Sequence, residues 1–251
     1  MRDIIKSEFY KVRKSVVTKV TAICMLAIAG VQILGYLYAK LSGGIWEEIF
    51  QGTRGCDTYA YFCTGSFFLV FVAMFIGGMI TNEFAHGTVR QMVSRGVPKF
   101  KIALGQYLAL SVNMTVIALI PAILLMAVGT ACWGFGSVSV PRFLLIVFGQ
   151  LAVIWSYTGI SMLIAHITRS GGLAIGLNIL FLLGGSLATQ ILAVLTEQDW
   201  IWEYWILQMM SGAVNRTLEW EMQFQYSAIL IVLGIVCTVL GTLRFHMSDV
   251  N

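Results

Sequence analysis

The sequence predicts an all-α membrane protein with six transmembrane helices, and two observations lead to this fold class. The chain of 251 residues is 58% hydrophobic and only 11% charged, with a mean hydropathy of +0.83, whereas a soluble domain is about 25% charged. Six apolar stretches are also long enough to cross a bilayer, which takes about 20 apolar residues in a helix. Helices are expected because the backbone must satisfy its own hydrogen bonds inside lipid.

The six predicted spans contain no Asp, Glu, Lys or Arg. They cover approximately residues 20–39, 60–81, 102–128, 143–167, 171–195 and 226–243. Carriers driven by protons or ions usually keep an ionisable side chain inside the membrane. The uncharged spans therefore predict an energy source outside the membrane part, and a secondary carrier that works without ATP is the weaker alternative.

The basic residues are divided unequally between the two sides of the predicted bundle. Twelve Lys and Arg residues fall on the side of the two termini, and four fall on the other side. Cytoplasmic loops carry the excess of basic residues. We therefore expect a multi-pass protein of the cell membrane with both termini in the cytoplasm, as an even number of spans requires.

The N-terminal segment 1–19 is predicted to form an amphipathic helix. Ile5, Phe9, Val12 and Val16 fall on one face at helical spacing. Such a helix lies in the headgroup layer before the chain turns into the first span.

Residues 81–101 form a strongly polar segment between the second and third spans. Four cations, Arg90, Arg95, Lys99 and Lys101, stand there against one acid, Glu83. A short basic helix at this place can dock into a partner protein or lie on anionic lipid. The residues alone do not decide between these two alternatives.

The glycines and the proline of this segment predict its shape. Gly87 can end the second helix, and Thr88 suits the N-cap of a short helix that runs to Arg95. Gly96 then ends this helix, and Pro98 fits near the start of the third span.

Asn113, Gln150 and Asn178 are uncharged polar residues inside predicted spans. They are expected to bond neighbouring helices or to line a substrate path. Gly172 and Gly176 form a small-x-x-x-small pair that allows close helix packing, within one chain or between subunits.

Residues 196–225 are rich in aromatic and acidic side chains, and too many charges interrupt them for a span. Tryptophan gathers at membrane interfaces. We expect two short helices, separated near residues 211–212, that lie on or dip into the outer leaflet. The side chains predicted at the interface are Trp200, Trp202, Trp205 and Trp220.

The sequence carries no recognisable catalytic or metal-binding motif. It has no G-x-x-x-x-G-K-[ST] loop for ATP, and no histidine has a second ligand four residues on, so no metal site is predicted. Cys56, Cys63 and Cys132 could lie on the outer side, where either one disulfide or free packing thiols are expected.

Residues 82–91, N-E-F-A-H-G-T-V-R-Q, resemble the E-x-x-x-G-T-x-R segment between the second and third spans of type-2 ABC transporter permeases. Residues 8–14, E-F-Y-K-V-R-K, are similar to the surface elbow helix of that family. With six spans and an aromatic outer hairpin, the resemblance covers essentially the whole chain, and it is most like permeases of lantibiotic immunity and peptide export.

The resemblance implies one permease domain over residues 1–251, with an elbow helix at 1–19, a coupling helix region at 82–98 and an outer interfacial hairpin at 196–225. The residues that it assigns to ATPase coupling are Glu83, Phe84, His86, Gly87, Thr88, Arg90 and Arg95.

The resemblance also implies the partners and the reaction. Two separate cytoplasmic ABC ATPase subunits would bind ATP and Mg, so this chain would hold no cofactor and would not itself be an enzyme. A second permease subunit, identical or related, and membrane lipids would complete the complex, without nucleic acid. The complex would move an amphipathic peptide, drug or lipid-like molecule out of a bacterial cytoplasm or membrane. A membrane anchor or sensor that recruits a cytoplasmic partner is the alternative from another class.

Overall fold

The structure is a computed structural model that describes residues 2–44 and 53–247. Within these ranges all regular structure is helical, which confirms the predicted all-α class. Part of the predicted first outer loop, residues 45–52, lies outside the described residues. The helices are α1 Arg2–Lys14, α2 Val16–Ser42, α4 Gly55–Phe62, α5 Ser66–Ala85, α6 Thr88–Ser94, α7 Lys99–Trp133, α8 Val140–Thr168, α9 Gly171–Ile179, α10 Gly185–Thr196, α11 Trp200–Glu203, α12 Ile206–Val214 and α13 Trp220–Met247.

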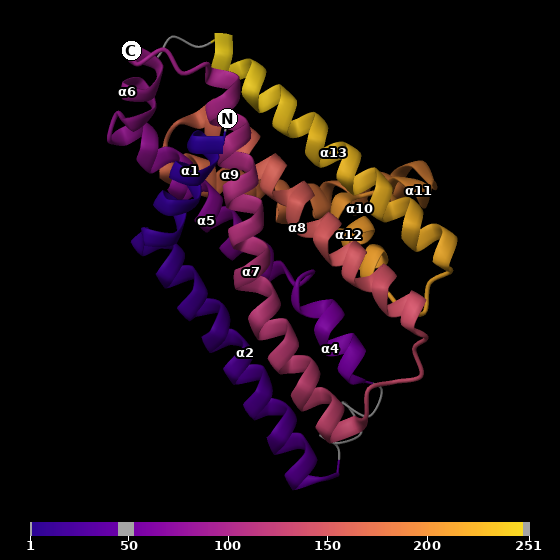
Figure 1. Cartoon of the computed structure of the whole chain (residues 1–251). Helices are drawn as coiled ribbons and strands as arrows, with labels where there is room; N and C mark the ends of the chain where they lie inside the picture. Colours follow the sequence, from indigo (N-terminus) through magenta and orange to yellow (C-terminus); the bar gives the residue numbers. More distant parts are fainter. Residues whose placement is uncertain (1, 45–52, 248–251) are drawn as a thin grey trace.

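In the described residues, six helical stretches are long enough and apolar enough to cross a membrane, which confirms the predicted number of spans. They are Val16–Ser42, Gly55–Ala85, Lys99–Trp133, Val140–Thr168, Gly171–Thr196 and Trp220–Phe245. In Figure 1, α1, α6 and the last turns of α13 gather toward the top, and α2 and α7 run side by side toward the bottom. We call the top the α6 end of the bundle; the charge distribution predicts that this end is cytoplasmic.

The second span is broken, which the sequence did not predict. Helix α4 ends at Phe62 and α5 begins at Ser66, after Gly65 in an extended conformation (φ −63°, ψ 140°). A break at this depth leaves backbone groups that need partners. The Gln150 side chain supplies one of them, because its Nε2 donates to the carbonyl oxygen of Tyr59 at 3.3 Å.

The fourth and sixth spans, α8 and α13, make the most extensive contact of all the helix pairs in the described residues. Their backbones approach through glycines: a Cβ added to Gly159 would lie 2.5 Å from the carbonyl oxygen of Gly234. Tyr157 is fully buried nearby on α8. Small residues at a crossing of two spans allow this close approach and gain van der Waals contact.

The first and fifth spans lie at the periphery of the bundle. In an apolar stretch of 18 residues within each span, only 17% of the first span and 11% of the fifth are buried, against 61% for the fourth span. Gly172 and Gly176 have open space around them, so the predicted small-residue pair makes no close contact within the described chain. The fifth span also changes winding, because residues Leu180–Gly184 form a π-helical segment between α9 and α10.

The outer segment differs from its prediction in where its helices break. The expected break at residues 211–212 is wrong, because α12 runs through both residues from Ile206 to Val214. Gly212 serves packing, since a Cβ there would lie 2.6 Å from the Tyr226 ring. The break falls instead between α11 and α12, and α13 already begins at Trp220.

The α8–α13 contact leads to a first prediction. Gly159→Ala should lower the free energy of unfolding by about 1–3 kcal/mol, because the new methyl group overpacks a backbone contact. The matched control is Gly30→Ala on α2, where nothing lies within 4 Å of the added Cβ. Thermal unfolding of both variants in detergent checks this, and equal midpoints for the two variants would contradict the packing described here.

Candidate functional site

Helix α1 meets the end of α5 and the start of α7 at the α6 end of the bundle. It is shorter than the predicted segment 1–19, because it ends at Lys14 and a new helix, α2, begins at Val16. Ser15 separates the two helices, and its Oγ accepts a hydrogen bond from Val17 N at 3.2 Å. Val16, predicted on the apolar face of the first helix, is instead a 72% exposed residue of α2.

The most buried side chains of α1 are Val12 and Glu8, a carboxylate that is only 1% exposed. Gly105 of α7 allows this helix to come close. A Cβ on Gly105 would lie 3.3 Å from Ile4 Cγ2 and 3.4 Å from Glu8 Cγ. The contact with α7 therefore buries a charged residue where the sequence pattern indicated an apolar stripe.

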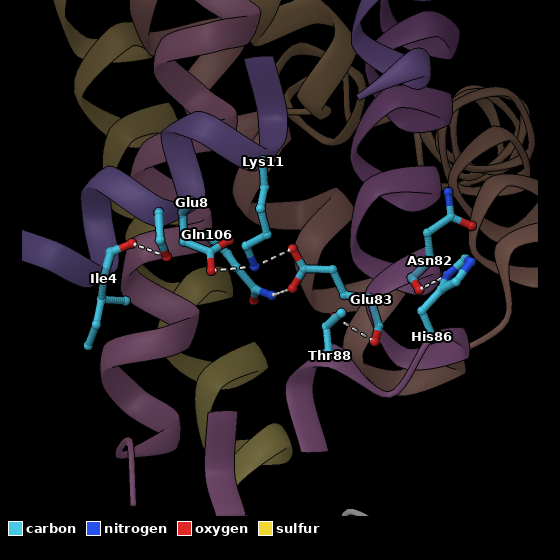
Figure 2. A network of polar contacts seen from close by, with 9 residues as sticks. Ile4, Glu8, Lys11, Asn82, Glu83, His86, Thr88 and Gln106 are labelled. Atoms are coloured by element: carbon cyan, nitrogen blue, oxygen red, sulfur yellow. Dashed lines mark hydrogen bonds and ion pairs between the residues drawn. The ribbon is translucent and has the colours of Figure 1, made fainter. Parts of the chain in front are cut away.

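Glu8 belongs to a polar cluster of four side chains, Glu8, Lys11, Glu83 and Gln106, from α1, α5 and α7 (Figure 2). Lys11 Nζ lies 2.6 Å from Glu8 Oε1 and 3.0 Å from Glu83 Oε1. Gln106 Nε2 donates to the other oxygen of Glu83, Oε2, at 2.6 Å. One ammonium and one amide thus hold the end of α5 between α1 and α7.

The cluster contains two carboxylates and one ammonium in a poorly hydrated place. The side chains of Glu8, Glu83 and Lys11 are 1%, 11% and 31% exposed. Burial, followed by the charge of Glu83, raises the pKa of Glu8 to about 7. Burial opposes the charge of Lys11, but the two carboxylates outweigh it and raise the pKa of Lys11 above its usual value. Glu8 therefore changes charge near neutral pH while Lys11 stays cationic.

The short helix α6 follows α5 directly and is bounded by two left-handed glycines. Gly87 (φ 65°) precedes it and Gly96 (φ 79°) follows it, a conformation that only glycine adopts easily. The predicted N-cap role of Thr88 is wrong, because Gly87 occupies the cap and makes no side-chain bond. The hydroxyl of Thr88 instead donates back to the carbonyl oxygen of Glu83 at 3.0 Å.

The seven residues that the resemblance assigned to coupling divide into two groups. Glu83, Phe84 and Thr88 point into the bundle or back onto α5 and hold the turn in place. His86, Arg90 and Arg95 are exposed, and Gly87 forms the bend between the groups. On α6 itself, Val89 is the buried side chain, so most of this helix faces outward.

Phe84 belongs to a second cluster, which is aromatic and connects the C-terminal ends of α5, α8 and α13. Its ring lies 6.0 Å from His166 and 5.9 Å from Phe245, edge-on to both. His166 stacks on Phe245 at 5.3 Å, and the Arg169 guanidinium lies 5.7 Å from the Phe84 ring centroid. The end of α5 is therefore fixed on one side by charges and on the other by rings.

The three polar residues predicted inside spans are hydrogen-bonded within the chain. Asn113 Nδ2 donates to the carbonyl oxygen of Ala109 at 2.7 Å. Buried Asn178 accepts from Ser161 Oγ at 2.9 Å, and buried Gln150 bridges to α4. The role in helix bonding is confirmed for Gln150 and Asn178, whereas a substrate path through the three residues stays a prediction.

A membrane-depth cavity of about 360 Å³ lies between α7, α8 and α13 and contains none of these three residues. Its lining is almost entirely apolar or aromatic. The lining residues are Tyr107, Phe148, Leu151, Ala152, Trp155, Ser156, Ile231 and Ile235. A ligand there would be recognised by shape and apolar contact.

The four tryptophans predicted at the outer interface differ in exposure. Trp200 and Trp220 are 59% and 65% exposed. Trp202 is half-buried, and half-buried Trp205 packs against the Phe181 ring at a centroid distance of 5.3 Å. Two of the four are therefore available to a membrane interface, and Trp205 holds the hairpin on the fifth span.

At the end of the bundle opposite α6, an ion pair closes the loop between α12 and α13 onto α4. Arg216 Nε lies 2.7 Å from Asp57 Oδ1, and Arg142 donates to the carbonyl oxygens of Arg216 and Leu218. Sequence reasoning did not identify this pair, because the two residues are distant in the chain and each sits in an ordinary loop context.

Sequence reasoning also missed Glu8, Lys11, Gln106 and His166 as parts of a site. A signal existed for Glu8, which is one of only two acids in a segment with six cations. Gln106 was a polar residue near the start of an apolar run. Neither pattern shows which helix the side chain faces.

The described residues hold no group of three or more His, Cys, Asp or Glu that could bind a metal ion. All five cysteines are free thiols in the structure.

The fold and this site define the chain as a multi-pass helical membrane protein with a polar brace at one end of its bundle. A family model described as "Protein of unknown function (DUF2705)" matches residues 16–251, so the chain belongs to that family. The comparison with curated proteins finds no match.

The raised pKa of Glu8 predicts a pH-dependent stability. The folded state holds this proton more tightly than the unfolded chain does, so the stabilisation is complete below the ordinary pKa of 4.5 and is lost as the pH rises through about 7. Between pH 5 and pH 8 the wild type should lose about 2–3 kcal/mol relative to Glu8→Gln, since one pKa unit is worth 1.36 kcal/mol.

Unfolding free energies at the two pH values measure this difference. Asp3→Asn is the control, because it removes an exposed acid from the same helix. If Glu8→Gln and wild type change in parallel with pH, Glu8 is already ionised in the folded protein and the cluster is not as described.

Proposed function

We propose that the chain is the permease subunit of an ATP-driven ABC exporter in a bacterial cell membrane. The observation that carries the proposal is the short helix α6, which lies between the second and third spans and faces outward while its base is clamped. A transport subunit that is driven by a separate ATPase needs an exposed helix for the ATPase to contact. The base of that helix must be rigid, because otherwise a movement of the ATPase would bend the helix and would not move the spans.

The clamp supports a role for α6 in coupling. Glu83 is tied to α1 and α7 through Lys11 and Gln106, and Phe84 is packed on α8 and α13. A push on α6 therefore reaches four helices through contacts at adjacent residues of α5. Arg90 remains on the exposed surface of α6, where it would meet an acidic rim of a partner ATPase.

The distribution of charge supports an energy source outside the membrane. Asp57 and Glu83 lie near the two ends of the second span, and each has a cationic partner. Ion-coupled carriers place such groups deeper, where they can change state during the cycle. ATP and Mg would be bound by two cytoplasmic partner subunits, and this chain would contribute no catalytic residue.

The exposed first and fifth spans support a second permease subunit, the same chain or a related one. Both spans are poorly buried in the single chain, and Gly172 and Gly176 on α9 leave open space for a close helix contact. A path between two subunits would be lined by apolar side chains. This favours an amphipathic substrate, such as a peptide of the lantibiotic kind, a drug or a lipid-like molecule.

The proposal predicts that changing the bend before α6 uncouples ATP hydrolysis from the permease. Gly87→Pro should reduce substrate-stimulated ATPase activity at least about tenfold, because proline cannot adopt the φ of 65° at this residue. Glu83→Ala should reduce it in the same direction by loosening the end of α5. The assay uses the chain reconstituted in nanodiscs with the partner ATPase subunits that the proposal requires.

Gly44→Pro is the matched control, since Gly44 has the same φ of 65° and open space around it. It lies just after the C-terminal end of α2, at the end of the bundle opposite α6. It should leave the stimulation near the wild-type level. Full stimulation by Gly87→Pro in a normally assembled complex would contradict the coupling role, as would substrate flux that continues without the ATPase.

A further inference from the structure

A cleft of about 500 Å³ separates α1 from α6 at the α6 end of the bundle. Its walls come from two helices far apart in the sequence. Lys6, Tyr10 and Lys11 line it from α1, and Gln91, Met92 and Arg95 line it from α6. The cleft therefore lies beside the polar cluster but opens outward.

The lining of the cleft is cationic, and none of the described residues that line it is acidic. Lys11 forms ion pairs with Glu8 and Glu83, and these two carboxylates compensate its positive charge. Lys6 and Arg95 are exposed and make no ion pair with any residue in the described ranges. Two cations that lack an ion pair among the described residues, one on each wall, thus face a shared space.

The positions of α1 and α6 in the chain indicate where the cleft lies relative to the membrane. Helix α1 runs directly into the first span, and α6 lies between the second and third spans, so both helices must lie at the membrane surface. Tyr10 is 67% exposed on one wall of the cleft. Phe100, which is five residues after Arg95 at the start of α7, is 56% exposed. Aromatic side chains of this kind favour the headgroup level of a bilayer.

We propose that this cleft binds the phosphate group of an anionic phospholipid from the adjacent leaflet. Lys6 and Arg95 neutralise the phosphate from opposite sides, and the Tyr10 hydroxyl and the Gln91 amide can donate to its oxygens. The acyl chains of this lipid stay in the bilayer next to the helix ends. A soluble acidic peptide has no such anchor at the level of the cleft. The bound lipid bridges α1 and α6, and this binding does not depend on the transport function.

Titration of the purified full chain in neutral detergent with dioctanoyl-phosphatidylglycerol tests the site. The Lys6→Gln/Arg95→Gln double variant should bind about tenfold more weakly than the wild type, because each cation near a membrane surface contributes substantially to the attraction of anionic lipid. The matched control is Arg13→Gln/Arg90→Gln, which removes two exposed cations from the same two helices outside the cleft lining. It should bind within about twofold of wild type, and circular dichroism should show unchanged helix content in both variants.

Two further ligands identify the source of the phosphate. Dioctanoyl-phosphatidylcholine should bind at least about tenfold more weakly than the phosphatidylglycerol, since its choline cancels the charge. Inorganic phosphate that binds as tightly as the lipid would overturn the lipid assignment. Equal losses in the cleft variant and in the control variant would overturn the site, because binding would then reflect only the overall positive charge.

Discussion

One half-buried ammonium shared by two carboxylates determines how the α6 end of the bundle is built. Lys11 holds Glu8 on its own helix and Glu83 on α5, and Gln106 completes the contact from α7. Removing one member of a buried ionic group leaves the others uncompensated, which costs far more than an exposed ion pair is worth. The packing of α1 on α7, where Gly105 leaves room for Ile4 and Glu8, brings Glu8 and Lys11 into this arrangement.

The polar cluster gives the short helix α6 a rigid base. Glu83 and Phe84 anchor the end of α5, and the exposed Arg90 of the short helix remains available to a partner. The glycines at the two ends of α6 confine the backbone freedom to two points. A short helix between two bends, on a rigid base, can transmit a displacement into several spans together.

Much of the fold could be predicted because membrane insertion imposes it locally. Length and apolarity identify the spans, and Gly87 and Gly96 mark the limits of the short helix. The broken second span could not be predicted, because its stability rests on Gln150 of another helix. The polar cluster could not be predicted either, since an amphipathic pattern does not show which polar residue turns inward. Gly212 was misread as a helix break because the Tyr226 ring that requires it lies on the next helix.

A double-mutant cycle between Lys11→Met and Glu83→Gln measures how strongly the polar cluster joins α1 to α5. The free energies of unfolding of the wild type, the two single variants and the double variant give the interaction between the two side chains without the rest of the network. The structure predicts a coupling of about 1.5–3 kcal/mol, because the two groups touch at 3.0 Å in a poorly hydrated place. Additive effects, within about 0.5 kcal/mol, would show that α1 is not braced to α5 and would contradict the account.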